Sequence, residues 1–336
     1  MLRSNLRQVL LGVFPIIAKY TIIDGGNRMI KFQLNVLCAF VIAKVSRAVL
    51  LATFLLFSGI VIAQSNYHFE KLGVNEGLPH SDVLDIVQGP YGFIWIATTN
   101  GLCRYDGFNL VTYRHSNSEI YSLSGNRTLS LCFTADSLLL VGTEGSGLNI
   151  YSTDDDNFKA YKHNPDQDNT ISSNVVFEIF QSESGQIWLG TDHGFDELIL
   201  EGSNVSFKNI VFVDLVVKQI LEVKPNVLWL ATNQGIYEYD ILSGQYQVLF
   251  PDLIFNAVLR LSEQEVLLGS YAGLFLWNGN ELKLVNSSPT LSMVKDSESN
   301  LWVGTNGEGL LKVEIPSFEF SKLEPNKSNP ASLSHN

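Results

Sequence analysis

The polar residues that could take part in chemistry form no recognised catalytic pattern. The sequence lacks the glycine-rich phosphate loop, the G-x-S-x-G serine elbow and the H-E-x-x-H zinc motif. A glycosidase needs two carboxylates that converge on one sugar bond, and no motif identifies such a pair among the 34 acidic residues. The run 166–169 starts like a calcium loop but lacks its glycine and its terminal glutamate, which favours a turn. We therefore predict no catalytic residues, no metal site and no cofactor.

A second set of polar residues varies in chemistry while its positions recur along the chain. All but one of them follow strand-like segments at the same point of each repeat, the exception being His80 from a joint between blades, and we expect turns and joints to share one face. Pockets of all-β folds open at such loop-bearing mouths, so this face could recognise a polar ligand. For any single residue, an ordinary turn role is the alternative, even for His193, which could titrate near neutral pH. The candidates are His80, Asn100, Glu144, Asp192, His193, Asn233, Gln234, Tyr271, Asn306 and Glu308.

Charge and cysteine content exclude several classes of protein. The net charge is −12, and residues 64–336 alone carry 15 basic and 33 acidic residues. Such an acidic body repels a phosphate backbone, so we expect no nucleic-acid partner. Cys38 lies near the N-terminus, and Cys103 and Cys132 show no zinc-ligand spacing. We expect the latter two to be isolated buried thiols, with a single disulfide as the alternative.

The first 63 residues resemble a targeting segment. They hold seven basic residues and one acid, and Ala48–Ala63 is a run of sixteen residues without charge. The run is shorter than the ~20 residues of a stable span and ends on the small residues of a signal cleavage site. We predict a signal peptide, with an N-terminal membrane anchor as the alternative, and Met29 as a second possible start. Either reading places the remainder in the periplasm or another extracytoplasmic space.

Residues 64–336 are organised by an internal repeat, which predicts the fold. A hydrophobic segment of the form I/L-W-I/L/V-G/A-T occurs near residues 95, 140, 188, 229, 267 and 302, and a glycine and an apolar residue follow each. The Thr or Ser of this segment recurs at intervals of 35 to 48 residues, the length of one four-stranded propeller blade. The sequence therefore predicts an all-β propeller of six four-stranded blades, with almost no helix.

Each strand of a blade can be placed in the sequence. Val83–Gln88 and 175–181 are typical of inner strands, and the Trp-bearing segment follows as the second strand. Gly101–Tyr105 and Leu110–Tyr113 are typical of the third and fourth strands. The small Gly or Ala before each Thr indicates a crowded position, and the tryptophans indicate packing between blades.

The joints between blades suggest that the ring is incomplete. Residues 78–81, 123–126, 171–174 and 333–336 align with one another, so a seventh unit would open at the last of them. Residues 67–72 are similar to an outer strand without a blade before it. We therefore predict part of a seven-bladed ring, with exposed strand edges and a tendency to associate.

These repeats resemble the two-component regulator propeller repeat. Its pattern is matched by Gly185–Thr191 and by the joint 76–83, and 101–106 matches its close. The resemblance covers residues 67–336, although Leu140 and Leu267 replace the tryptophan and Ser270 replaces the threonine.

The resemblance implies a function that the residues alone do not show. Such repeats form the periplasmic sensor region of bacterial hybrid two-component histidine kinases, many of which sense oligosaccharides. It implies a non-enzymatic sensor whose partners are an oligosaccharide, downstream repeats and a kinase of the same parent, and a second copy as a homodimer. The alternatives are a secreted carbohydrate-active propeller enzyme, lyase or hydrolase, and a protein-interaction propeller.

Overall fold

The computed structural model describes residues 69–202, 204–212, 214–326, 328–329 and 332–333. The signal or anchor expected within residues 1–63 lies outside them, as do three of the four residues of the joint 333–336. Tyr67–Asn336 forms one compact unit. No helix among the described residues is long and apolar enough to cross a membrane.

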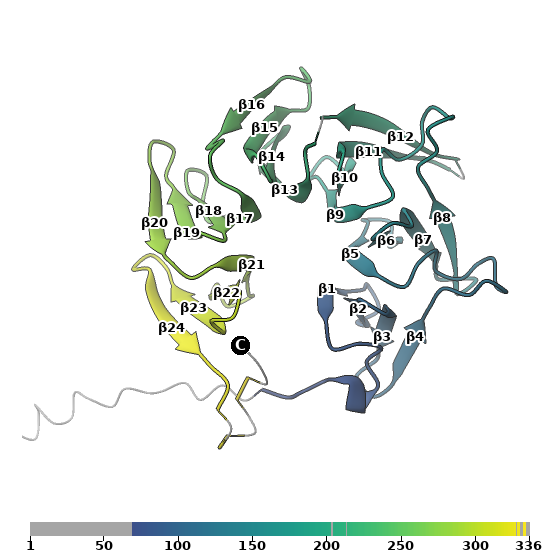
Figure 1. Cartoon of the computed structure of the whole chain (residues 1–336), viewed down its shortest axis with the longest axis horizontal. Helices are drawn as coiled ribbons and strands as arrows, with labels where there is room; N and C mark the ends of the chain where they lie inside the picture. The colour runs from purple at the N-terminus through teal and green to yellow at the C-terminus, as the bar shows by residue number, and fades with distance from the viewer. Residues whose placement is uncertain (1–68, 203, 213, 327, 330–331, 334–336) are drawn as a thin grey trace, which may run out of the picture. The chain divides into compact units, whose positions relative to one another are not determined.

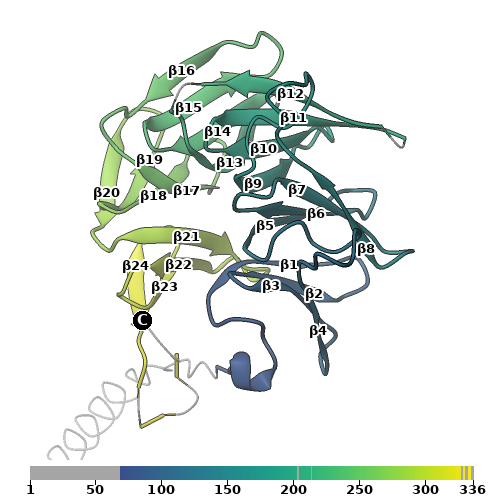
Figure 2. The same ribbon diagram turned by 45° about the vertical axis from the view of Figure 1, so that its right-hand side comes forward.

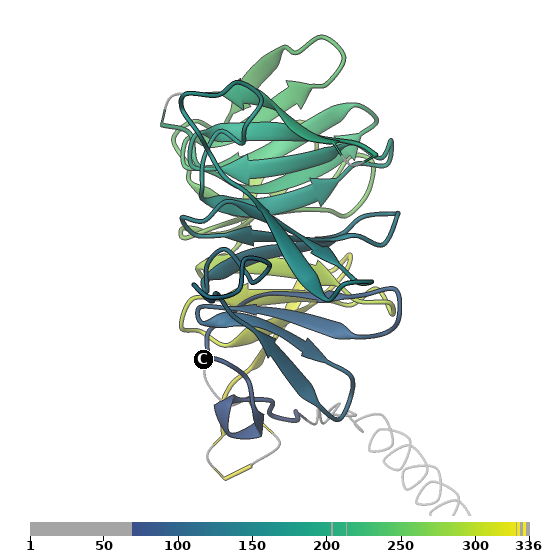
Figure 3. The ribbon, with the colours of Figure 1, turned by 90° about the vertical axis from the view of Figure 1, so that its right-hand side faces the viewer.

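The described chain folds into six sheets of four antiparallel strands each, so the predicted β-propeller is confirmed. In Figure 1 the first strand of every sheet faces the centre of the ring and the fourth lies at its rim; the arrangement is seen obliquely in Figure 2 and from the side in Figure 3. The first three blades are β1 (Val83–Gln88), β2 (Ile94–Thr98), β3 (Gly101–Tyr105), β4 (Leu110–Tyr113); β5 (Thr128–Phe133), β6 (Leu139–Thr143), β7 (Leu148–Ser152), β8 (Asn157–Tyr161); β9 (Val176–Gln181), β10 (Ile187–Thr191), β11 (Gly194–Glu201) and β12 (Asn204–Val211). The last three are β13 (Val217–Lys224), β14 (Val227–Thr232), β15 (Gly235–Asp240), β16 (Tyr246–Leu249); β17 (Phe255–Arg260), β18 (Val266–Ser270), β19 (Gly273–Trp277), β20 (Leu282–Asn286); β21 (Thr290–Lys295), β22 (Leu301–Thr305), β23 (Leu310–Glu314) and β24 (Glu319–Leu323).

The repeated threonine closes the turn between the second and third strands. The Thr191 hydroxyl donates to the carbonyl oxygen of Gly194 at 3.0 Å, and Thr232 does the same to Gly235 at 2.8 Å. Both threonine side chains are fully buried. A buried hydroxyl needs a partner, and this short turn supplies one, which explains why the residue recurs where it does.

The core lies between blades rather than inside any one of them. Trp188 is 1% exposed and packs with Phe195 of its own blade against Leu215 and Ile220 of the next. The position before the threonine is as crowded as predicted: a Cβ atom at Gly190 would lie 2.8 Å from the carbonyl oxygen of Val217 in the neighbouring blade. Tight packing between consecutive sheets therefore holds the array together.

The ring is open between its last and first blades. The inner strands β1, β5, β9, β13, β17 and β21 contact each other in that order, whereas no extensive contact between β21 and β1 occurs within the described residues. The outward faces at this opening carry apolar residues: Ile86 is 59% exposed and Val294 is 60% exposed. That the complete ring has seven blades stays a prediction.

Two local expectations have different outcomes. Residues 69–72 form no strand, so the expected outer strand is wrong for the part that is described. An extended segment becomes a strand only beside a partner strand, whereas here Leu72 and Leu78 pack on the face of the first blade around Ile96. Cys103 and Cys132 are free thiols, as expected, with Cys103 buried and Cys132 partly so.

Candidate ligand-binding face

The second-to-third-strand turns and the joints between blades lie on one face, as the repeat predicts. The backbone amide of Gly101 donates to the carbonyl oxygen of Asn126 in the following joint at 2.6 Å. Gly194 donates in the same way to Leu215, at 2.9 Å. These bonds tie each turn to the entrance of the next blade. The ten candidate residues, which are spread over the six blades, therefore lie around the same face.

Several candidate side chains are already engaged in holding this face together. The Asn233 amide accepts a hydrogen bond from the Val216 backbone amide at 2.9 Å and donates to the carbonyl oxygen of Asp214. The Gln234 amide also donates to that oxygen, at 3.1 Å. For these two residues, the turn role weighed against ligand binding agrees with their contacts.

The other engaged candidates bond within their own part of the face. Glu144 forms an ion pair with Arg127, and Glu308 accepts a hydrogen bond from the Ser288 hydroxyl at 2.9 Å. The His80 ring lies 2.7 Å from the Thr99 hydroxyl. These contacts use atoms that would otherwise bind a ligand. Six candidates are exposed at the surface: Glu144 and Gln234, which are engaged as described, and Asn100, His193, Tyr271 and Asn306.

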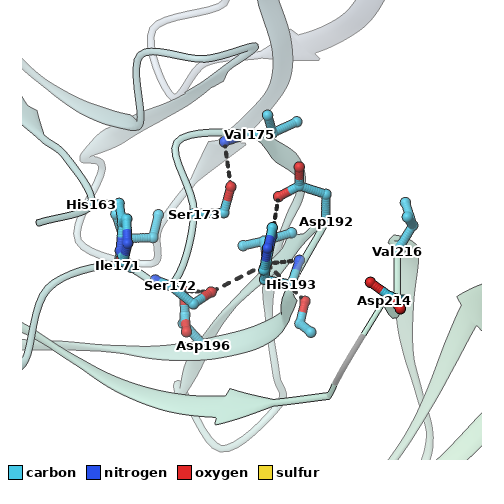
Figure 4. A network of polar contacts seen from close by, with 12 residues as sticks. His163, Ile171, Ser172, Ser173, Val175, Asp192, His193, Asp196, Asp214 and Val216 are labelled. Atoms are coloured by element: carbon cyan, nitrogen blue, oxygen red, sulfur yellow. Dashed lines mark hydrogen bonds and ion pairs between the residues drawn. The ribbon is translucent and has the colours of Figure 1, made fainter. Parts of the chain in front are cut away.

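Asp192 and His193 belong to a polar network at the entrance to the third blade (Figure 4). The His193 ring nitrogen Nδ1 lies 3.0 Å from the Asp192 carboxylate. Burial alone would raise the pKa of Asp192, but hydrogen bonds from Ser173 and His193 together lower it. Asp192 is therefore a charged acceptor, and His193, whose side chain is 65% exposed, can present its free ring edge to solvent.

Behind this pair lies a second carboxylate that serves the fold. Asp196 is fully buried and accepts hydrogen bonds from the backbone and the hydroxyl of Ser172, both at 2.9 Å. Asn209 donates to its other oxygen at 2.8 Å. Burial raises the pKa of Asp196, and these bonds oppose that effect. Asp196 thus fixes the joint that carries Ser173 beside Asp192.

The structure adds two residues to this face that the sequence analysis did not select. Lys218 and Asn256 occupy register shifts at the starts of the inner strands β13 and β17. The Lys218 Nζ atom lies 2.7 Å from the Asn256 Oδ1 atom and 5.7 Å from the centre of the Tyr271 ring. The sequence did contain a signal for these two residues: Lys218 and Asn256 are polar, whereas the other blades have Leu or Phe at the same position of the inner strand.

The inner strands also bring together three ionisable groups. Burial raises the pKa of Glu178 well above its ordinary value, and the nearby Asp85 raises it further. Burial raises the pKa of the Cys132 thiol to about 11, and the carboxyls of Glu178 and Asp85 add to this effect. A thiol held in its neutral form is a poor nucleophile, so this cluster does not resemble an activated catalytic centre.

Two surface cavities lie away from the ten candidates. One of about 470 Å³ is lined by the outer strands of the first two blades, including Tyr113 and Phe158. The other, of about 430 Å³, lies between the fourth and fifth blades and includes Trp229 and Trp277. None of the ten candidate residues lines either cavity, and their role in ligand binding stays a prediction. The described residues contain no cluster of three or more metal-binding side chains.

Comparison with known proteins identifies the repeats. The model of the two-component regulator propeller matches residues 77–100 and 283–307. A curated relative, histidine kinase P4 of Formosa agariphila, is 26% identical over 241 residues, which are 54% of this chain and 18% of that protein. The chain thus spans less than a fifth of the curated relative that it matches.

Solved structures share the architecture. The extracellular domain of the putative hybrid two component system BT3049 from B. thetaiotaomicron matches with a TM-score of 0.72 and 22% identity, over 80% of this chain and 38% of that chain. Virginiamycin B lyase from Staphylococcus aureus matches with a TM-score of 0.56 and 13% identity, over 72% of this chain and 83% of that chain. At these identities the likeness concerns the fold. The described residues thus form a six-bladed β-propeller, in which 77–100 and 283–307 match the two-component regulator propeller.

Proposed function

We propose that this chain is an extracytoplasmic ligand-sensing module of a two-component signal-transduction system, and that its ligand is an oligosaccharide. The observation that carries the proposal is the presence of regulator propeller repeats in a fold shared with the extracellular domains of hybrid two-component systems. The chain itself is a binding module, and the signal passes to a histidine kinase of the same parent. A signal peptide or anchor within residues 1–63 exports it, and a second copy forms a dimer.

The face formed by the turns and joints suits this role. Its framework repeats from blade to blade through the threonine hydroxyls and the turn-to-joint hydrogen bonds. Its exposed side chains differ: Asn100 and Asn306 offer amides, His193 a ring nitrogen, and Tyr271 an aromatic ring. An oligosaccharide presents hydroxyl groups and apolar ring faces, which amides and aromatic rings respectively can bind.

Binding to the folded full chain should be measured with a panel of oligosaccharides, using the thermal unfolding midpoint. A ligand at 100 times its dissociation constant stabilises the folded state by about 2.7 kcal/mol, which corresponds to roughly 5 to 10 °C for a domain of this size. Tyr271→Ala should reduce the shift. Tyr91→Ala is the matched control, because Tyr91 is also exposed but lies on a turn of the opposite face.

The same panel separates the sensor from the carbohydrate-active enzyme and the interaction module. Release of sugar products at a steady rate would contradict the sensor proposal and favour a lyase or hydrolase. Failure of every oligosaccharide to change the midpoint would contradict oligosaccharide sensing and leave the protein-interaction propeller as the better reading.

A further inference from the structure

Lys218 is the cation at the mouth of the ring that is left without a charged partner. Lys218 is the second residue of β13 and is half-buried, and no carboxylate forms an ion pair with it among the described residues. Among the described residues, its ammonium group donates one hydrogen bond, to the neutral Asn256 amide at 2.7 Å. An ammonium group has three donors, so two are left for water or a ligand.

The surroundings hold this ammonium group in a defined place. Asn256 turns its Oδ1 atom toward Lys218 because its Nδ2 atom donates to the carbonyl oxygen of Thr290 in the following blade, at 3.2 Å. The centre of the exposed Tyr271 ring lies 5.7 Å from the Lys218 Nζ atom. Residues from three consecutive blades therefore set the position of one cation beside one exposed aromatic ring.

The carboxylates of the same face do not neutralise this cation. Glu144 is paired with Arg127, Glu308 lies 3.9 Å from Lys322, and Asp192 lies beside His193. Burial lowers the pKa of Lys218, and no carboxylate among the described residues opposes that change by raising it. A partly desolvated charge that lacks a counter-ion is costly, and an anionic ligand group would remove that cost.

We infer that Lys218, Asn256 and Tyr271 form a subsite for an acidic sugar, whose carboxylate or sulfate group contacts Lys218 while its ring stacks on Tyr271. This inference rests on the proposed function, and it narrows the ligand from oligosaccharides in general to uronate-containing or sulfated ones. The ordinary ring-to-cation pair of Lys159 and Tyr161, 5.3 Å apart on an outer strand, provides an internal comparison away from the mouth.

The test measures dissociation constants of the full chain by titration calorimetry. The probes are tetragalacturonate, a sulfated galactan tetrasaccharide, and the neutral galactotetraose and cellotetraose. We expect one acidic probe to bind at least tenfold more tightly than the neutral ones. Tighter binding of tetragalacturonate would indicate a carboxylate ligand, and tighter binding of the sulfated tetrasaccharide a sulfate. Lys218→Gln should weaken that binding by about tenfold or more, since a hydrogen bond to a charged group is lost. Added salt should weaken it as well.

Three variants control for other causes. Lys159→Gln removes the same charge from a similar ring and should leave the affinity unchanged, and Lys218→Arg should retain most of it. Tyr271→Ala, at an exposed residue, serves as the second test if Lys218→Gln does not fold. Neutral probes that bind as well as acidic ones, or full affinity in both Lys218→Gln and Tyr271→Ala, would overturn the subsite while leaving oligosaccharide sensing intact. Binding of no saccharide at all would overturn both.

Discussion

Ile220 and Ile86 occupy the same position in their blades but have opposite surroundings. Ile220 on β13 faces the preceding blade and is 2% exposed, whereas no blade precedes β1 among the described residues and its Ile86 is 59% exposed. At the other end, Val294 on β21 is 60% exposed, while Leu221, its counterpart on β13, packs into a core cluster. The repeat therefore places apolar residues on both faces of every sheet, and the position of a blade in the array decides whether a neighbouring blade covers them.

The open faces are not changed into polar caps. Terminal units of repeat arrays generally need polar outer surfaces for solubility, yet both end blades keep apolar residues at the opening. Leu72 and Leu78 cover Ile96 on the first blade and leave Ile86 exposed. The interior and the ends of the array should thus respond differently to the same substitution.

The largest difference is expected for the two isoleucines. Ile220→Ala should lower the free energy of unfolding by about 2 to 5 kcal/mol, since it leaves a cavity between two sheets. Ile86→Ala should change it by less than about 0.5 kcal/mol, because its side chain is mostly in water. Chemical denaturation of the three proteins measures both values. An equal loss of unfolding free energy in the two variants would mean that Ile86 is also buried in solution, by another segment or another molecule at the opening.

Glu178 should make stability depend on pH. The pKa of Glu178 is raised in the folded chain. As pH rises above the ordinary pKa of glutamate, the carboxyl loses its proton in the unfolded state first, and this lowers the stability of the folded state relative to the unfolded one. Glu178→Gln lacks this effect. Relative to the parent it should show no gain near pH 4 and a growing gain toward pH 7, about 1.4 kcal/mol for each unit by which the folded pKa is raised.

Unfolding curves at several pH values for Glu178→Gln and the parent provide this measurement. The matched variant is Asp85→Asn on the end blade. Asp85 accepts backbone hydrogen bonds from Leu131 and Ile86 at 2.7 Å, which oppose the effect of burial on its pKa, so its pH-dependent gain should be smaller. A pH-independent difference for Glu178→Gln would refute the assignment.

The turn hydroxyl should contribute a smaller amount in both regions. Thr191→Val leaves the Gly194 carbonyl oxygen without its hydroxyl partner and should cost about 1 to 3 kcal/mol, because Thr191 is fully buried. Thr305→Val removes the equivalent bond to Gly309 in the last blade, where Thr305 is only partly buried. Water can replace that bond, so a loss below 1 kcal/mol is expected. Thermal unfolding compares the two.

The smallest effect on stability is expected from charging the open faces. Ile86→Glu and Val294→Glu should leave the unfolding midpoint nearly unchanged, since both side chains are exposed. Together they should reduce self-association, because apolar exposed patches promote contacts between copies. Sedimentation of the double variant against the parent tests this, with Tyr91→Glu on the exposed turn between β1 and β2 as control. An unaltered association state would place the contact elsewhere.

Much of the fold could be predicted because the strands are encoded locally. The bounds of β1, β3 and β4 agree with the expected ranges 83–88, 101–105 and 110–113. Alternating side chains, turn glycines and the repeated threonine are short-range features, so they can be recognised without knowing the partners. The same features placed the candidate residues on one face.

The sequence by itself thus determined the blades, their order and the face on which the variable turns lie. Only the tertiary structure decided which of those turn residues are engaged: Gln234 bonds to Asp214 twenty residues away, and Glu308 to Ser288. It also decided that a register shift places Lys218 beside Asn256 and Tyr271, and that Ile86 faces water. These outcomes depend on contacts between blades, and such contacts follow from how sheets pack around the ring rather than from the order of residues within one repeat.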